Sequence, residues 1–273
     1  MMRLLSRPSV RRLLTPFMVS VYVDQPVRFL ANELTRRKIA RSYRLRESGV
    51  SVVVRHPHVE LWMLDEIFRR RVYEPPVEVL RRIGQLGRPP RILDLGACAG
   101  LAGAFFLGRF PGAEVVALEP DPQNAGLQRR AIAANGPSTQ WSLVEAAAAT
   151  SDGIAELTSD HFLSRIVPEP VGLRTTTVRT VELYPHLRGV DLVKMDVQGS
   201  EWALLSDERF ATAIGACAIV LEYHPAGAPS ADGRAAAAEL LAAAGFRVHP
   251  SVTDEHLGEG TLWAYRNLHV GRA

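Results

Sequence analysis

Short hydrophobic runs alternate with helical patterns from residue 91 onward. Seven runs predict strands, at 91–95, 114–119, 140–147, 190–196, 217–223, 244–249 and 260–266. Apolar residues at helical spacing lie between most of them. This alternation is typical of an α/β fold, in which a parallel sheet carries helices on both faces. An Asp-Gly turn among threonines and valines predicts an extra hairpin over 151–180, inserted before the fourth strand.

The chain before residue 91 has a different pattern. The expected elements are two or three helices within 1–48, strands at Val50–Arg55 and Val59–Leu64, a helix over Asp65–Tyr73, and another from Pro75 to Ile83. Residues 84–90 are rich in glycine and proline, which indicates a linker. We therefore divide the chain into an N-terminal, mainly helical segment, 1–88, and a larger domain, 89–273.

The turn after the strand at 91–95 carries the clearest chemical signal. A strand, a glycine turn and a helix N-terminus bring unpaired backbone N–H groups to one point, which is typical of a nucleotide-type site. Glycine in such a turn also lets a ligand approach the backbone. The residues of this turn are our first cofactor-binding candidates: Asp94, Gly96, Ala97, Cys98 and Gly100.

The turn does not fit a dinucleotide. A nicotinamide or flavin fingerprint requires G-x-G-x-x-G, whereas Cys98 and Leu101 occupy its second and third glycine positions. The carboxylate of Asp94 also has the wrong sign beside a pyrophosphate, but the right sign beside a cation. S-adenosylmethionine carries a sulfonium and an ammonium and has no phosphate, so we infer that it is the cofactor.

The end of the next strand favours the same cofactor. Glu119 lies 119 − 94 = 25 residues after Asp94, about the span of one helix and one strand. A carboxylate at this strand end can accept hydrogen bonds from both ribose hydroxyls. The alternative is a surface glutamate at a strand end. Pro120, which turns the chain toward another helix, is a further cofactor-binding candidate.

Three motifs together resemble those of a known family: Asp94-Leu-Gly-Ala-Cys-Ala-Gly100, Leu118-Glu-Pro-Asp-Pro-Gln-Asn124 and Asp191-Leu-Val-Lys-Met-Asp-Val-Gln-Gly-Ser-Glu201. Over roughly residues 60–225 the chain resembles the FkbM-type family of S-adenosylmethionine-dependent methyltransferases. The resemblance implies a Rossmann-like class I fold with a seven-stranded, mostly parallel sheet that ends in a hairpin-like strand. It also implies O-methylation of a small-molecule hydroxyl, on a sugar or a polyketide-like natural product.

Two positions depart from the pattern usual in that family. Cys98 stands where the family has Asn, which changes a hydrogen bond of the turn, and Gln198 stands where it has Glu. An amide does not titrate, so any acid–base role at position 198 is lost.

The ends of two later strands carry the catalytic candidates, Asp196, Glu222 and His224. Ligands of open parallel sheets lie outside the carboxyl ends of the strands, so Asp196 is also a cofactor-binding candidate. An alcohol is a poor nucleophile unless a base takes its proton, and we favour His224 because the pKa of an imidazole can lie near neutral. The alternatives are a helix N-cap for Asp196 and a purely structural role for His224.

Lys194 lies inside the same apolar run as Asp196 and therefore needs an acidic partner, for which Glu201 and Glu222 are the candidates. A metal ion held by Asp196, Glu222 and His224 is conceivable. Catechol-type methyltransferases, however, have an Asp-Asn pair on this strand, and the sequence lacks it. We therefore expect no metal.

Weaker cofactor-binding candidates lie elsewhere. The adenine edge usually meets the residues after the third strand of such a sheet, here Glu145, Ala146 and Ala147. Tyr73 precedes the first strand and either covers the methionine end of the cofactor or packs within a helix.

Composition and charge limit the classes of molecule that the chain is expected to bind. Residues 1–90 hold 18 basic and 8 acidic residues, whereas 91–273 hold 14 and 21. The basic segment can bind nucleic acid, membrane lipid or an anionic substrate, or it can pack on the acidic domain. We favour packing, with a small molecule as the acceptor. A homo-oligomer through the N-terminal segment stays open. Two cysteines provide neither a disulfide framework nor a four-cysteine zinc site, which fits a reduced, cytoplasmic setting.

Targeting and competing functions change this picture little. No run of 18 apolar residues predicts a membrane span. Residues 1–23 have the basic and apolar residues of a signal peptide, but Pro16 interrupts them and no cleavage site follows. RNA methylation is an alternative function, although the chain lacks an Asn-Pro-Pro-Tyr-type motif and a nucleophilic cysteine after the fourth strand. A non-catalytic cofactor-binding or scaffold protein is another, because Gln198 is an amide.

Overall fold

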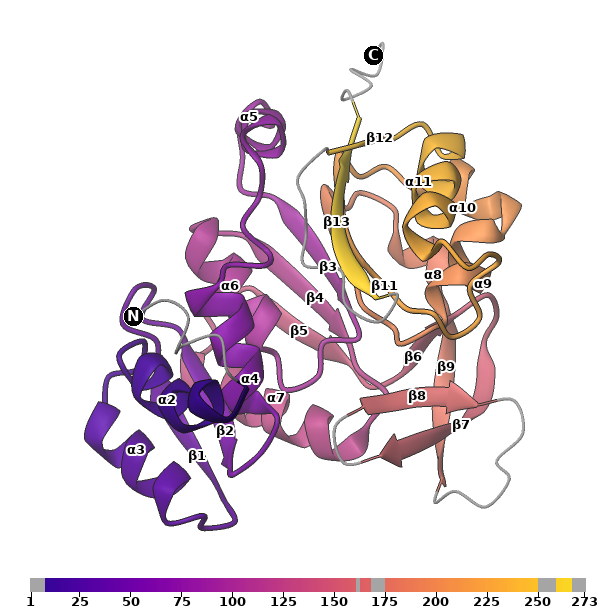
Figure 1. The fold of residues 1–273 in the computed structure, drawn as a ribbon. Coiled ribbons are helices and arrows are strands. Elements are labelled where there is room, and N and C mark those ends of the chain that lie inside the picture. Colours follow the sequence, from indigo (N-terminus) through magenta and orange to yellow (C-terminus); the bar gives the residue numbers. More distant parts are fainter. Residues whose placement is uncertain (1–7, 161–162, 168–174, 250–258, 267–273) are drawn as a thin grey trace.

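A seven-stranded sheet forms the centre of the molecule (Figure 1). The computed structural model describes residues 8–160, 163–167, 175–249 and 259–266. Its strands, in spatial order, are β12 (Arg247–Val248), β13 (Gly260–Tyr265), β11 (Ala218–Tyr223), β10 (Leu192–Met195), β3 (Arg91–Leu95), β4 (Glu114–Leu118) and β5 (Trp141–Val144). All neighbours pair in parallel except β13, which runs antiparallel to both β11 and β12. The predicted Rossmann-like class I fold is therefore confirmed.

The order of the strands predicts that a ligand binds at the carboxyl ends of β3 and β10. After β3 the chain proceeds outward to β4 and β5, whereas β10 and β11 lie on the opposite side of β3. Ligands of open α/β sheets bind at such a switch point, outside the carboxyl ends of the strands.

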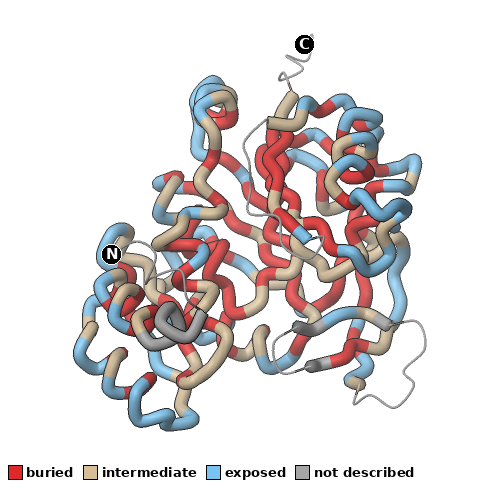
Figure 2. Tube along the Cα trace, in the orientation of Figure 1, coloured by how far each residue is buried: buried red, intermediate tan, exposed pale blue. Residues whose placement is uncertain are grey.

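Two hydrophobic clusters cover the two faces of this sheet. Alternate residues of a strand point to opposite faces, so Ile92 packs in one cluster and Leu93 in the other. The first cluster includes α6 (Leu101–Arg109) and α7 (Pro122–Asn135). The second includes α8 (Leu183–His186), α9 (Glu201–Ser206), α10 (Glu208–Ala213) and α11 (Gly233–Ala243). Figure 2 shows the strands buried between these layers.

The N-terminal part packs on the first face. Its elements are α2 (Pro8–Ser20), α3 (Pro26–Leu34), β1 (Ile39–Arg44), β2 (Ser51–His56), α4 (Glu60–Leu64), a π-helix η1 (Asp65–Arg69) and α5 (Val77–Gly84). Val19, Phe29 and Val53 belong to the same cluster as Ile92 and Phe105. The first hydrophobic cluster therefore includes residues on both sides of residue 88, and the division into 1–88 and 89–273 stays a prediction.

Two of the predicted N-terminal elements were wrong. The basic stretch that we placed among helices contains β1, which pairs antiparallel with β2 from Ile39 opposite His56 to Arg44 opposite Ser51. The run Val59–Leu64, predicted as a strand, forms α4 over Glu60–Leu64. A short apolar run does not distinguish a strand from a buried helix, and a strand's partner depends on long-range pairing.

The predicted extra hairpin is part of a small second sheet. Its order is β6 (Ala147–Ala149), β9 (Thr175–Glu182), β7 (Gly153–Asp160) and β8 (Leu163–Val167). β7 pairs antiparallel with both β8 and β9, which confirms the hairpin. The predicted strand 140–147 is divided between β5 and the start of β6. Among the described helices, none is both long and apolar enough to cross a membrane.

Candidate active site

The turn between β3 and α6 lies against the end of β10. Gly96 has φ 71°, and a Cβ at this position would lie 1.8 Å from the backbone oxygen of Asp196. Only glycine fits there, and its absent side chain lets the two strand ends meet. Gly100 (φ 84°) caps α6, and a Cβ there would lie 2.7 Å from the Trp141 ring. Both glycines are thus required by the packing of the turn as well as by its backbone conformation.

Glu119, at the end of β4, is bound to this turn. Its Oε2 accepts a hydrogen bond of 2.6 Å from the Cys98 N–H, and its Oε1 accepts one of 2.9 Å from the Asp121 N–H. Burial raises the pKa of Glu119 to about 7, against the effect of these two N–H groups. Each oxygen of a carboxylate has two acceptor sites, so Glu119 still has acceptor capacity for two hydroxyls.

Asp94 is wholly buried beneath the turn and has a cationic partner there. Lys194 Nζ lies 3.3 Å from Asp94 Oδ1 and 3.7 Å from Asp196 Oδ2, and it donates a 2.8 Å hydrogen bond to the Gly96 carbonyl. Burial alone would lower the pKa of Lys194, but the two carboxylates hold this pKa above its usual value.

The ion-pair partners expected for Lys194 were therefore wrong, although the charge of Glu222 also contributes to the raised pKa of Lys194. Sequence favoured Glu201 or Glu222, whereas the ion-paired carboxylates are those of Asp94 and Asp196. The reason is register, because Lys194 on β10 lies directly opposite Asp94 on β3. Lys194 neutralises Asp94, the charge that we had assigned to the cofactor, and a direct contact of Asp94 with the cofactor stays a prediction.

The three catalytic candidates converge beside this ion pair. One ligand atom from each of Asp196, Glu222 and His224 lies within 4.8 Å of the others. His224 Nε2 is 3.7 Å from Asp196 Oδ1, which is too far for a hydrogen bond. Tyr73 donates a 3.1 Å hydrogen bond to Glu222 Oε2, and its ring stacks on that of Phe106. Tyr73 thus joins the first face of the sheet to the cluster.

Glu201 contacts both the ring and the backbone of His224. Glu201 Oε1 lies 3.1 Å from His224 Nδ1 and accepts a 2.8 Å hydrogen bond from the His224 N–H. Burial alone would lower the pKa of His224, but the Glu201 hydrogen bond and the Asp196 charge raise this pKa to about 9. Burial, together with the charge of Asp196, raises the pKa of Glu222 to about 8. The crowded carboxylates therefore favour protonated forms of the cluster.

Comparisons with known proteins agree with this geometry. The model of the methyltransferase FkbM domain matches residues 94–248, which is more than half of the chain. The chain belongs to the FkbM methyltransferase family. It is an S-adenosylmethionine-dependent methyltransferase, and S-adenosyl-L-methionine is its cofactor. No curated protein matches the chain.

The chain is also distantly similar to solved structures. One is an S-adenosylmethionine-dependent methyltransferase from Agrobacterium tumefaciens, with 12% identity over 84% of this chain and 70% of the other, at a TM-score of 0.46. Another is a precorrin-6y C5,15-methyltransferase from Geobacter metallireducens GS-15, with 17% identity over 69% and 86%, at a TM-score of 0.41. These likenesses are too remote to bear on the substrate of this FkbM protein.

The two departures from the usual FkbM pattern both fall on left-handed residues. Cys98 has φ 49° and Gln198 has φ 54°. Asn adopts this conformation more readily than most residues, so Cys98 lies in a backbone conformation that suits Asn better. Gln198 uses its amide as a donor, since Nε2 donates a 2.8 Å hydrogen bond to Asp196 Oδ1. The amide therefore fixes a carboxylate that we place in the site.

Glu201 is the residue that sequence reasoning valued too little. We considered it only as a partner of Lys194, yet it contacts His224. The available signal was its position at the end of the Asp191–Glu201 motif. Glu201 begins α9, close to the end of β10, which carries Asp196, and to the end of β11, which carries His224.

The weaker cofactor candidates have different surroundings. Glu145 is exposed and forms an ion pair with Arg129. Ala146 and Ala147 are buried, and Pro120 is partly buried. Their contact with the cofactor stays a prediction.

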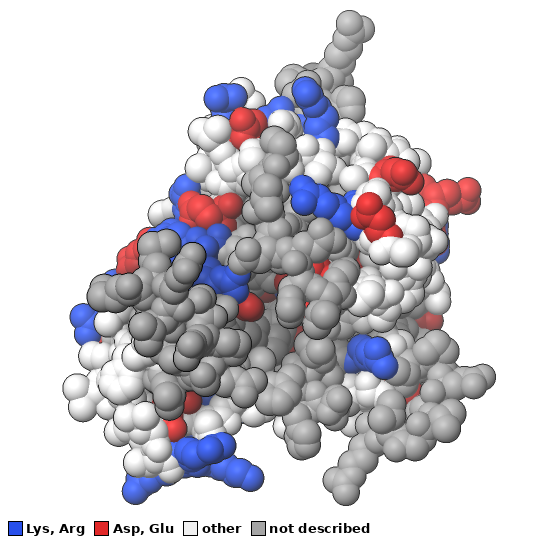
Figure 3. Space-filling view, viewed as in Figure 1, with Lys and Arg blue, Asp and Glu red and all other residues white. Residues whose placement is uncertain are grey.

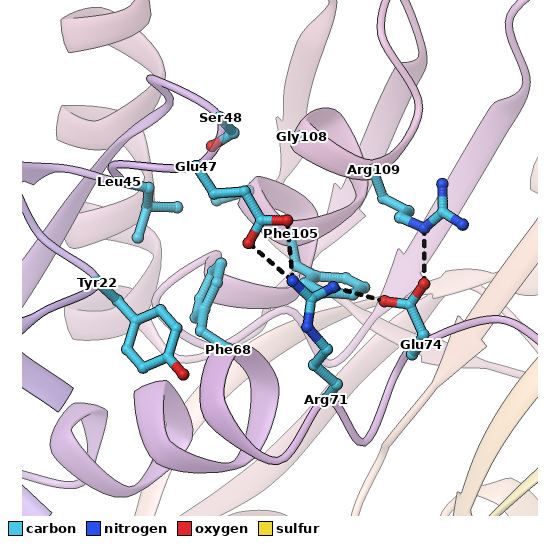
Figure 4. A pocket seen from close by; sticks show the side chains of 11 residues that line it. Tyr22, Leu45, Glu47, Ser48, Phe68, Arg71, Glu74, Phe105, Gly108 and Arg109 are labelled. Carbon is cyan, nitrogen blue, oxygen red and sulfur yellow. Dashed lines mark hydrogen bonds and ion pairs between the residues drawn. The ribbon is translucent and has the colours of Figure 1, made fainter. Parts of the chain in front are cut away.

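A cavity of about 270 Å³ lies elsewhere, between the N-terminal elements and the end of α6 (Figure 4). Its rim carries Arg71, which forms 2.9 Å ion pairs with both Glu47 and Glu74, and Arg109, which lies 2.8 Å from Glu74. Phe68 also lines the cavity. None of the candidate site residues lines it, so we separate it from the cofactor site.

Proposed function

We propose that this enzyme is an O-methyltransferase that acts on a hydroxyl of a small molecule, such as a sugar or a polyketide-like natural product. The observation that carries the proposal is the convergence of Asp196, Glu222 and His224 beside the glycine turn. An acceptor hydroxyl placed there would meet Asp196 together with Glu222 and His224, which can accept its proton once they are themselves deprotonated. Direct in-line transfer then needs chiefly the positioning of two reactants, which removes much of the entropic barrier.

The residues of the turn fit the cofactor. When bound, S-adenosylmethionine supplies an electrophilic methyl group on a sulfonium. We propose that Glu119 accepts hydrogen bonds from the ribose hydroxyls, because both of its oxygens keep acceptor capacity after binding the Cys98 and Asp121 N–H groups. Gly96 and Gly100 would contribute the backbone conformation of the turn, since Asp196 and Trp141 occupy the space that their side chains would fill.

His224 is the proposed base. A base must accept a proton through a free lone pair, and Nε2 is the ring nitrogen that faces Asp196 without a hydrogen bond to it. With its pKa raised to about 9, the imidazole is neutral only at alkaline pH. We therefore expect turnover to rise as the pH increases from 7 to about 9.

Radiolabelled S-adenosylmethionine tests the proposal. Incubation with pools of hydroxylated sugars and polyketides should label a product whose new group is an ether methyl by mass spectrometry and NMR. Label found only on nitrogen or carbon would contradict O-methylation. Turnover should also survive dialysis against a chelator, because Lys194 already provides a cation beside Asp196. Restoration of lost turnover by Mn²⁺ would instead indicate a metal at the three converging side chains.

RNA is the alternative acceptor, and one surface feature favours it. Lys and Arg side chains gather at the lower left of the molecule (Figure 3). Arg36, Arg37 and Lys38 are exposed at the turn between α3 and β1, and Arg41 is exposed on β1. Binding to RNA through phosphates would weaken steeply with salt. Labelling of RNA at low salt, with no labelled small molecule, would favour this alternative.

The N-terminal segment is also our proposed self-association surface. Phe17 on α2 and Val21, in the turn that follows α2, are exposed at 49% and 58%. Light scattering of the wild type and of Phe17→Ser tests this. Both described cysteines are free, which supports a reduced, cytoplasmic location.

A further inference from the structure

We infer that Glu201 is a positioning residue that fixes the tautomer and the orientation of His224, so that Nε2 is the nitrogen available to the acceptor. This inference rests on the proposed function, in which His224 takes the proton of the hydroxyl. Glu201 would not touch either reactant. It would act entirely through the imidazole ring.

The carboxylate of Glu201 is itself rigidly held. It is fully buried at the start of α9, and its Oε2 accepts a 2.8 Å hydrogen bond from the Gly199 N–H. Its Oε1 accepts the 2.8 Å hydrogen bond from the backbone N–H of His224. Two backbone donors from different segments therefore fix both oxygens before the ring is considered.

The same oxygen selects the proton on the ring. A carboxylate accepts but does not donate when ionised, so His224 Nδ1, 3.1 Å from Glu201 Oε1, must carry the hydrogen. In the neutral imidazole only one nitrogen is protonated, so Nε2 keeps its lone pair. Orientation of a base by a buried carboxylate is the role of the aspartate in serine-protease triads, where an amide in its place stabilises the wrong tautomer.

The groups around the ring agree with this assignment. Asp196, from the end of β10, faces Nε2 at 3.7 Å, and Glu222 from β11 lies in the same cluster. Lys194 and Tyr73 approach these carboxylates rather than the ring nitrogens. The ring is further anchored through its own backbone, since the Trp202 indole N–H donates a 2.9 Å hydrogen bond to the His224 carbonyl.

Nitrogen NMR of the cofactor-free protein tests the inference without any turnover. The ring signals of His224, assigned by their loss in His224→Ala, should show protonation at Nδ1 in the neutral ring of the wild type. Titration should show a pKa that is lower in Glu201→Gln than in the wild type, because the amide removes the hydrogen bond and charge that raise it. The amide N–H₂ of Gln can donate to Nδ1, so the Nε2–H tautomer should gain population in that variant.

The pH profile of turnover provides the second measurement. Glu201→Gln should lower kcat by about 10²–10⁴-fold, the range typical of general-base catalysis, and leave the KM for the cofactor unchanged. In Glu201→Gln the rise of turnover with pH should occur at lower pH than in the wild type, in step with the lower pKa of His224 seen by NMR. Glu33→Gln is the matched control, because Glu33 is another buried glutamate beside a histidine Nδ1, that of His56. Glu33→Gln should change neither the pH at which turnover rises nor kcat.

The outcomes separate this inference from the proposed function. A neutral wild-type ring protonated at Nε2 would overturn the inference, and this measurement does not depend on whether Glu201→Gln folds. An unshifted pH limb in a folded Glu201→Gln would overturn it too. Full turnover in His224→Ala, with Nδ1 protonated as expected, would instead overturn the assignment of His224 as the base.

Discussion

Glu33–His56 and Glu201–His224 are both buried glutamate–histidine pairs, and they differ in what the second ring nitrogen meets. In the N-terminal part, His56 Nδ1 lies 2.5 Å from Glu33 and its Nε2 lies 2.9 Å from the hydroxyl of Tyr43. Asn32 in turn donates a 2.9 Å hydrogen bond to that hydroxyl. At the ends of the strands, His224 contacts Glu201 through Nδ1, but its Nε2 has a carboxylate at 3.7 Å.

This difference separates structure from chemistry. Both nitrogens of His56 are satisfied, and a fully hydrogen-bonded buried network makes a region rigid and specific. Only one nitrogen of His224 is hydrogen-bonded within the described structure, and the other faces the groups beside the cofactor turn. The same pair of residue types thus joins α3 to the β1–β2 hairpin in one place and presents a base in the other.

The largest expected effect comes from removing the second histidine. His224→Ala should lower kcat by about 10²–10⁴-fold, because a base contributes about that much, and should leave cofactor affinity unchanged. Calorimetry with S-adenosylmethionine and single-turnover assays check the two halves of this expectation. The matched variant His56→Ala should have the opposite profile, with loss of stability and normal turnover per folded molecule. Equal loss of turnover in both variants would break the comparison.

A buried charge tests the site from its other side. Lys194→Met removes the cation between Asp94 and Asp196, and it should lower the free energy of unfolding by about 3–5 kcal/mol, because a buried carboxylate is left unpaired. Denaturant unfolding measures this. The double variant Lys194→Met with Asp94→Asn should recover part of the loss, since it removes the pair together. No recovery would mean that Asp94 is not the partner that matters.

The first pair should respond in stability alone. Glu33→Gln weakens the buried bond to His56 and should lower the free energy of unfolding by about 1–3 kcal/mol, the cost of a poorly satisfied buried polar group. Thermal unfolding checks the loss, and Tyr43→Phe, which removes the hydroxyl at the other nitrogen, should give a similar value. A change in kcat for either variant would show that the N-terminal pair reaches the active site.

Sequence alone predicted the sheet well for a physical reason. Its strands are buried on both faces, so they appear as apolar runs, and the rule that ligands lie at their carboxyl ends brought Asp196, Glu222 and His224 together. Element type failed where the signal depends on a distant partner. β1 carries Arg41 and Arg44 among its residues and becomes a strand only because β2 pairs with it.

Side-chain partners were harder to predict than strands. The pairing of Lys194 with Asp94 follows from the register of β10 against β3, and no local pattern encodes that register. The hydrogen bonds between Glu201 and His224 form only because the end of β11 lies next to the start of α9. Both contacts join residues that are far apart in the chain, which a single sequence does not relate.

The smallest effect, and the one that tests the cofactor side of the site, is the pH dependence of binding. Burial raises the pKa of Glu119 to about 7, so the free enzyme loses the carboxylate form as the pH falls through 7. The ribose hydroxyls need an acceptor, so cofactor affinity should be constant above this pKa and fall by up to about tenfold for each pH unit below it. Calorimetry measures how the affinity for the cofactor changes with pH. The range from pH 5.5 to 8.5 covers about 1.5 units on either side of the pKa of Glu119.

Glu119→Gln is the control, because an amide cannot titrate. This variant should bind the cofactor more weakly, by about 1.5–3 kcal/mol, and its affinity should not change with pH in this way. A slope that persists in Glu119→Gln would show that another group titrates, either in the cluster around His224 or on the amino group of the cofactor itself.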